Sequence, residues 1–197
     1  FIFFFLIFNS SIKAENIIIE AKNITLNKNQ KSSLFENEVK VETKDGYTIK
    51  SDSAEYNKET GILILKKNIT GNDEKNNIIK ADFAKYDENS KIFLTTGPTS
   101  IITSEDYFIE SSDIKLNNLT KKISSKNKTI VTDLDKNKIF VDNFEYQTGS
   151  NIFKSIGNIE VIDNKQNKYE FSQVYIDTQK KEILGTDIKS YINDKSF

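Results

Sequence analysis

A repeat of thirty residues constrains this chain more than any other feature of its sequence. The segments that begin at residues 17, 47, 77, 107, 137 and 167 align without an insertion, and the stretch 77–87 shows the shared pattern most clearly. Self-similarity at a fixed period of this length is typical of arrays in which each unit packs against its neighbours. The repeat therefore predicts copies stacked along one axis around a continuous apolar interior.

Within each copy, apolar side chains recur at every second position, which is the period of a β-strand. Ile49 and Ser51 alternate with polar residues, as do Ala54 and Tyr56, and the phase changes at Asp52–Ser53 as it would at a bulge or tight bend. Polar turn segments such as 57–61, 87–90 and 163–167 separate the runs. The pattern predicts an all-β chain of about fifteen short strands, in antiparallel sheets with one wet face. Two architectures fit it: a β-helix, and a jelly-roll-like array of antiparallel strands.

The composition argues against an enzyme. The 197 residues include no Cys and no His, and all 28 cationic side chains are Lys. The chain therefore lacks thiol nucleophiles, disulfides, thiolate and imidazole metal ligands, and the usual general base. The carboxylates lie at turns without the pairing that acid–base chemistry needs, and the loop from Asp133 lacks the Gly and Glu of a calcium loop. A net charge of −1 offers nothing to nucleic acid. We expect no catalytic site, no metal, no cofactor and no nucleic-acid partner.

The first fourteen residues differ from the rest of the chain. Phe1 to Phe8 form an unbroken apolar run that leads through polar residues to Ala14, which is typical of the end of a secretory signal peptide. A longer membrane anchor and a hydrophobic first strand are the alternatives. We interpret residues 1–14 as the C-terminal part of a signal peptide and residues 15–197 as one exported domain.

The alternation predicts one inward-facing stripe that runs through the copies. Its members are Ile49, Ala54, Tyr56, Ile79, Ala84, Tyr86, Ile109, Ile114, Leu116, Ile139, Phe144 and Tyr146. The stripe fits either an ordinary hydrophobic core or a groove that accepts acyl chains between two sheets. Ala54 and Ala84 each stand two residues before a Tyr on the same face, and this small-beside-large pairing is expected to leave a recess.

The residues also carry a resemblance to a known family. Ile79-Lys-Ala81-Asp-Phe-Ala84-Lys-Tyr86, with the closing element Gly157-Asn-Ile159-Glu-Val161, resembles the OstA-type repeat of lipopolysaccharide transport proteins. The similarity covers about residues 17–195, although Lys67-Asn68 replaces the closing glycine in one copy. It implies an open β-jelly roll of the OstA-like type, built from the thirty-residue repeats, whose interior holds acyl chains. The inward stripe would then line a lipid groove.

The last residues, 184–197, resemble the stretch that leads from the periplasmic domain of the outer-membrane assembly branch of the family, the LptD proteins, towards a membrane barrel. That resemblance implies non-enzymatic transfer of lipopolysaccharide from a periplasmic bridge to the outer membrane, on the periplasmic side of the cell outer membrane. The implied partners are lipopolysaccharide, a bridge protein joined by edge-strand addition, and the outer-membrane barrel with its lipoprotein plug. The alternatives are a soluble or inner-membrane-anchored bridge component of the same pathway, a β-solenoid surface adhesin or scaffold, and, third, a hydrolase on a β-helix.

Overall fold

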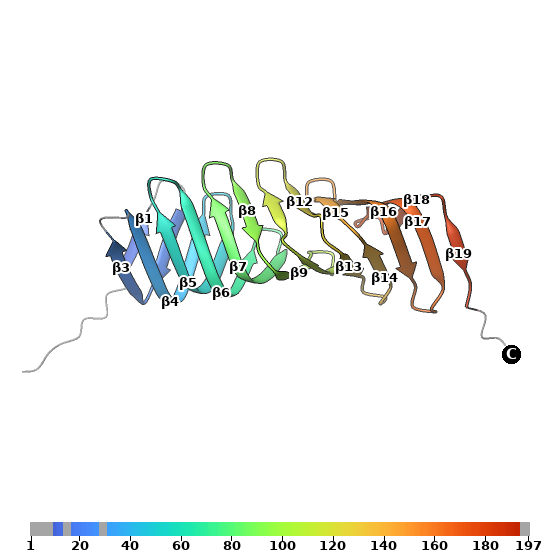
Figure 1. Ribbon diagram of the computed structural model, residues 1–197, viewed down its shortest axis with the longest axis horizontal. Coiled ribbons are helices and arrows are strands. Elements are labelled where there is room, and N and C mark those ends of the chain that lie inside the picture. Colours follow the sequence, from blue (N-terminus) through green and yellow to red (C-terminus); the bar gives the residue numbers. More distant parts are fainter. Residues whose placement is uncertain (1–9, 14–16, 28–30, 194–197) are drawn as a thin grey trace, which may run out of the picture.

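The computed structural model describes residues 10–13, 17–27 and 31–193, which form an elongated array of strands (Figure 1). Nineteen strands and no helix occur in this part of the chain, and every pairing between them is antiparallel. The predicted all-β jelly roll is therefore confirmed, and the β-helix alternative is wrong. The strand number exceeds the expected fifteen because the bends divide several copies into two short strands each.

Six long strands run through a bend and join two sheets, which we call the first and second leaf. The long strands are β4 (Ser32–Thr43), β5 (Thr48–Asn57), β6 (Ile62–Asn72), β7 (Ile78–Asp87), β16 (Ile152–Ile162) and β17 (Lys168–Asp177). In β5, for example, residues 48–51 belong to the first leaf and residues 53–57 to the second. The leaves are thus continuous with each other along the row of bends.

Shorter strands extend each leaf. The first leaf adds β1 (Ser10–Lys13), β2 (Ile17–Ala21), β9 (Pro98–Ile102), β10 (Phe108–Ser112), β13 (Thr129–Thr132), β14 (Lys138–Val141) and β19 (Lys189–Tyr191). The second leaf adds β3 (Asn23–Asn27), β8 (Ile92–Thr95), β11 (Lys115–Asn117), β12 (Lys122–Ser125), β15 (Phe144–Gln147) and β18 (Glu182–Thr186). The predicted signal segment falls mostly on residues outside the described ranges. Its residues 10–13 form β1, which pairs with β2.

The bends are β-bulges in which two residues of one strand oppose one residue of the next. Lys67 and Asn68 of β6 stand between the pairs Lys66–Phe83 and Ile69–Ala81, so that Asp82 alone opposes them. The expected phase change at Asp52–Ser53 is present, but the extra residue lies on the neighbouring strands. Lys67 has a φ of 62°, and Gly157 at the equivalent bend of β16 has a φ of 121°. This left-handed conformation explains the closing glycine of the repeat pattern.

Two rows of turns lie along the edges of the leaves away from the bends. The first-leaf turns are 43–47, 73–77, 103–107, 133–137 and 163–167, and the second-leaf turns are 57–61, 87–91, 117–121, 147–151 and 177–181. Side chains cap both kinds. Asp73 Oδ1 accepts a hydrogen bond from the Asn77 amide, and Asp87 Oδ1 accepts from the amides of Asn89 and Ser90. Because these caps recur at thirty-residue spacing, both rows follow the repeat seen in the sequence.

Neighbouring first-leaf turns are also joined to each other. Asn77 Oδ1 accepts a hydrogen bond of 2.9 Å from the amide of Ser104, one copy further along, and Asn137 accepts an equivalent bond from Asn164. The carboxylate of Asp133, where a calcium loop was considered, is occupied by the amide and side chain of Asn137. No cluster of carboxylates able to hold a metal ion is found among the described residues.

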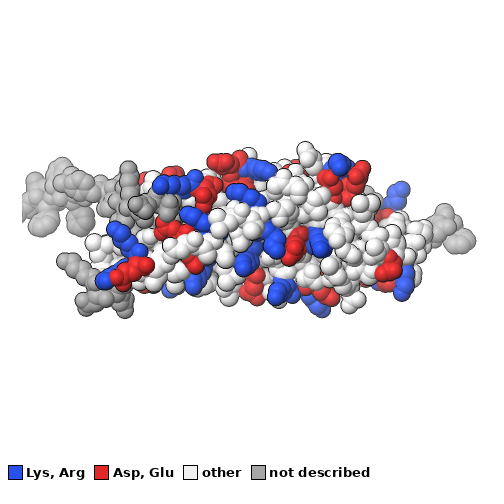
Figure 2. All heavy atoms as spheres, turned by 90° about the horizontal axis from the view of Figure 1, so that it is seen from above, with Lys and Arg blue, Asp and Glu red and all other residues white. Residues whose placement is uncertain are grey.

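The two ends of the array carry strands that have one neighbour each in the described part of the chain. These strands are β1 and β3 at one end and β18 and β19 at the other. At the far end the apolar side chains are uncovered, with Leu184 69% and Ile192 65% exposed. Elsewhere on the surface, Lys and Asp or Glu are interspersed along the length of the molecule in the view of Figure 2. No helix in the described ranges is long and apolar enough to cross a bilayer.

Candidate functional site

All twelve side chains of the predicted stripe face the space between the leaves. Ten of them are buried, and the other two, Ile79 and Leu116, are partly buried. Strand alternation accounts for this arrangement, since each inward residue is followed by an outward one, as Ile79 is by Lys80. The structure thus brings the stripe together as one lining, and whether lipid contacts this lining stays a prediction.

The interior is not one core but two. One cluster of buried side chains extends from Ile17 to Phe93, and a second extends from Ile101 to Ile176. Ile79 and Leu116 pack against both clusters. The junction between the clusters therefore lies near the middle of the array, where the first leaf contributes Ile79 and the second leaf contributes Leu116.

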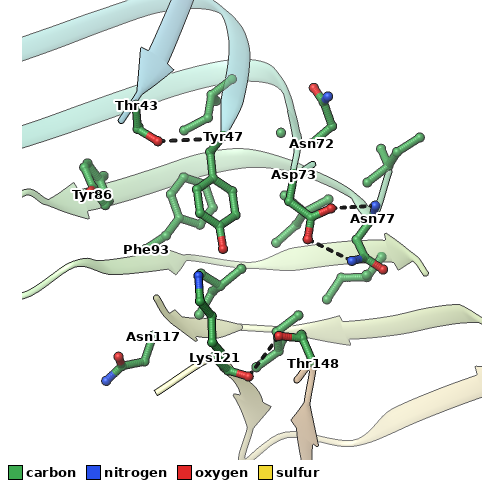
Figure 3. A pocket seen from close by; sticks show the side chains of 17 residues that line it. Thr43, Tyr47, Asn72, Asp73, Asn77, Tyr86, Phe93, Asn117, Lys121 and Thr148 are labelled. Carbon is green, nitrogen blue, oxygen red and sulfur yellow. Dashed lines mark hydrogen bonds between the residues drawn. The ribbon is translucent and has the colours of Figure 1, made fainter. Parts of the chain in front are cut away.

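A cavity of about 50 Å³ occupies this junction. Its apolar wall includes Ile49, Ile79, Phe93, Leu116 and Ile123. Its rim is formed by residues of both rows of turns, and Figure 3 shows Tyr47 from one row and Lys121 from the other pointing toward each other. The cavity consequently lies between the free edges of the two leaves, on the side away from the bends.

Gly71 explains why the cavity occurs in this copy. The inward position at residues 41, 71, 101, 131 and 161 holds Val, Gly, Ile, Val and Val in turn. Gly71 pairs with Ile49 and Ile79 on the neighbouring strands, and both of these line the cavity with it. A branched side chain is thus missing at one place in an otherwise filled row. The sequence signal for this site is the Gly at a position where the other copies hold Val or Ile, and a comparison of the copies position by position could have found it.

The expected recess beside the small residues is not where the space occurs. Ala54 and Ala84 are 2% and 0% exposed, and neither lines the cavity. Ala84 pairs with Leu65 on one side and Thr95 on the other, so its neighbours close over it. The prediction of a recess at these two alanines is wrong, because the adjoining strands supply the missing bulk.

Tyr56 and Tyr86, both members of the first buried cluster, have unequal surroundings. Tyr56 donates a hydrogen bond of 2.7 Å from its hydroxyl to Glu88 Oε2. Tyr86 lines the cavity and is 2% exposed, and its hydroxyl has no hydrogen-bond partner within the described structure. Burial, reinforced by the carboxylates of Asp45 and Glu88, raises the pKa of Tyr86. The hydroxyl is therefore protonated over the whole physiological range and can donate.

Tyr47, at the rim, is also kept protonated. Burial raises its pKa to about 12, with further contributions from the carboxylates of Asp73, Asp45 and Glu74. The rim thus combines a neutral phenol with the Lys121 ammonium, while the wall behind it is apolar. Sequence alternation alone could not single out Tyr47 or Lys121, because both belong to turns.

Among the described residues, three contacts run from the first-leaf turns to the second leaf. Each uses the third residue of a first-leaf turn. Asp45 lies 3.8 Å from the Lys91 ammonium, Lys75 donates a 3.0 Å hydrogen bond to the Thr148 carbonyl, and Glu105 Oε2 lies 3.5 Å from the Tyr146 hydroxyl. These side-chain contacts hold the leaves together where no strand pairing joins them in the described ranges.

Comparison with known proteins identifies no family for this chain. No family model and no curated protein matches the chain. Among solved structures, it is similar to the crystal structure of LptH from Pseudomonas aeruginosa, the LptA-homologous periplasmic component of the lipopolysaccharide transport device. The match covers 75% of this chain and 95% of that chain, with 15% sequence identity and a TM-score of 0.31. A similarity at this level establishes no family membership.

Proposed function

We propose that the protein is a non-enzymatic carrier of lipopolysaccharide, with acyl chains held between its two leaves. The observation that carries this proposal is the junction, where the apolar interior is interrupted by a cavity that lies at the free edges of the leaves. Acyl chains gain about 25 cal/mol for each Å² of apolar surface that they bury, so a lipid needs no specific polar pocket to bind. The resemblance of the repeat to the OstA type supports lipopolysaccharide as the lipid.

The cavity by itself is too small for a whole chain. At about 50 Å³ it has about a third of the volume of an engineered cavity of roughly 150 Å³ that holds one benzene molecule. The leaves must therefore part for a chain to enter. In the described part of the chain the leaves are continuous at the bends and are joined between the turns by side chains alone. Parting therefore needs the least free energy at the edge where the cavity already lies.

We further propose that this carrier acts on the periplasmic side of the outer membrane and passes lipid from a bridge protein to the outer-membrane barrel and its lipoprotein plug. A soluble or inner-membrane-anchored bridge component of the same pathway fits the same fold. The end formed by β18 and β19 supports a partner that adds a strand, since both strands have one neighbour and Leu184 is 69% exposed.

Site-specific photo-crosslinking tests the lipid proposal. A photoreactive residue at Ile79, which lines the cavity, should label lipopolysaccharide mixed with the purified protein, whereas one at the outward neighbour Lys80 should not. Ile109 and its outward neighbour Glu110 form a second matched pair. Equal labelling at inward and outward positions would refute a lipid groove and leave an ordinary core.

The edge-strand proposal has a separate test. Leu184→Pro removes one backbone donor from β18, and strand addition with a purified bridge component should weaken. Leu134→Pro, at the second position of the first-leaf turn 133–137 where Pro is favoured, should leave it unchanged. Association that is insensitive to both substitutions would contradict the proposed mode of contact.

A further inference from the structure

The hydroxyl of Tyr86, which has no hydrogen-bond partner in the described structure, indicates that the ligand carries a polar group in addition to its apolar chain. A buried hydroxyl without a partner costs free energy, and such groups are rare in folded proteins. Tyr86 is 2% exposed and belongs to the wall of the cavity. Since this inference concerns the same interior, it rests on the proposed binding of acyl chains.

We propose that the Tyr86 hydroxyl donates a hydrogen bond to the neutral carbonyl oxygen of an ester-linked or amide-linked acyl chain that lies in the junction cavity. The apolar residues Ile49, Ile79 and Leu116 would contact the first methylenes of that chain. The protein would thus recognise the linkage of the lipid as well as its hydrocarbon.

The charges around Tyr86 decide between a neutral and an anionic acceptor. The carboxylates of Asp45, Glu88 and Asp87 act on the Tyr86 hydroxyl, and each of them opposes a negative charge there. Lys91 is 3.8 Å from Asp45 and therefore already engaged. The Lys121 ammonium lies at the rim of the cavity, where it points toward Tyr47 (Figure 3). An acyl carbonyl can accept from the hydroxyl without bringing charge into this field, whereas the carboxylate of a free fatty acid or a phosphate cannot.

Comparison with the equivalent tyrosine of the preceding copy shows that the missing hydrogen-bond partner is particular to Tyr86. Tyr56 occupies the equivalent place one copy earlier, thirty residues before Tyr86, and is 4% exposed. Its hydroxyl is bonded to Glu88, and the residue does not line the cavity. Tyr56 therefore serves as a matched control for any loss of a buried hydroxyl.

Titration calorimetry with two detergents below their critical micelle concentrations tests the inference. Sucrose monolaurate carries an ester carbonyl next to its chain, and dodecyl maltoside carries an ether oxygen instead. We expect the unmodified protein to bind the ester about three- to tenfold more tightly, which is the effect of one neutral hydrogen bond. Tyr86→Phe should abolish this preference and leave the affinity for dodecyl maltoside unchanged. Tyr56→Phe should keep the preference for the ester.

A second measurement compares the bound ester in two proteins. The carbonyl stretch of bound ¹³C-labelled sucrose monolaurate should lie at lower frequency in the unmodified protein than in Tyr86→Phe, because only the unmodified protein offers the carbonyl the Tyr86 hydroxyl. Equal affinity for the two detergents, a preference that survives Tyr86→Phe, or an unshifted carbonyl band would overturn the inference, while the proposed lipid binding would stand. Failure of both detergents to bind would refute the two together.

Discussion

Filling the junction cavity from Gly71 should stabilise the protein and weaken its binding of lipid. Replacement by Ala adds one methyl group that points into the cavity, 3.0 Å from Ile79 Cγ2 and 3.7 Å from Ile49 Cγ1. The first contact is tight, but Ile79 is only partly buried, so the end of its side chain can move by a few tenths of an ångström.

The magnitude follows from two contributions. Cavity volume costs about 24 cal/mol per Å³, so complete filling of about 50 Å³ would return about 1.2 kcal/mol, and a methyl group returns roughly half of this. Replacing Gly by Ala in a conformation open to both adds about 0.4–1 kcal/mol through the unfolded chain. After the strain at Ile79, we expect Gly71→Ala to raise the free energy of unfolding by about 1 kcal/mol, or the melting temperature of the half of the array that contains Gly71 by about 4–8 °C.

Thermal and urea unfolding followed by circular dichroism measure the stability, and calorimetry with dodecyl maltoside measures the binding. Gly149→Ala is the control, because no atom lies within 4 Å of its added methyl group and its φ is not left-handed. The control should gain only the unfolded-state contribution and bind normally. A Gly71→Ala protein that is less stable than the original, or that binds the detergent unchanged, would refute the reasoning.

Two further predictions concern the turns. Backbone hydrogen bonds, first from Ser90, lower the pKa of Asp87, and a bond from Lys180 does the same for Asp177. Their stabilisation is complete above the ordinary pKa of 3.8 and is lost as the pH falls through the lowered values. Asp87→Asn/Asp177→Asn should therefore flatten the decline of the melting temperature with falling pH below pH 3.8. Asn57 and Asn117 hold the equivalent positions in other copies, so an Asn side chain can cap this turn. An unchanged pH dependence would show that other groups cause the loss of stability in acid. Separately, Lys75→Ala removes the bond to the Thr148 carbonyl and should speed the labelling of lipopolysaccharide from Ile79, whereas Lys165→Ala, three copies later, should not. Equal rates in all three proteins would show that this contact does not restrain the leaves.

Much of the fold was accessible from the sequence because it depends on local rules. The two-residue alternation predicted which side chains face inward, and the turn chemistry predicted where the chain reverses. Ile109, Phe144 and Tyr146 are accordingly buried as expected. The predicted bend at Asp52–Ser53 was located correctly, but assignment of the extra residue to Asn37–Glu38 and Lys67–Asn68 required the register of the paired strands.

The candidate site depended on relations that local rules do not contain. The cavity arises from the absence of a branched side chain at Gly71, which is visible only when the copies are compared with each other. The contacts of Asp45 with Lys91 and of Lys75 with Thr148 join turns of different copies. Which turns face one another is set by the offset between the two leaves, and no pattern within one copy encodes that offset.

The division of the interior into two clusters has a consequence for how the protein unfolds. In an array whose units contact mainly their neighbours, cooperativity passes from copy to copy through shared packing. At the junction that packing is reduced to Ile79 and Leu116 around a cavity. The two halves are therefore expected to melt as separate cooperative blocks, with a calorimetric enthalpy larger than the van't Hoff value. The chain would behave in calorimetry as two linked domains, although its strands form one uninterrupted sheet.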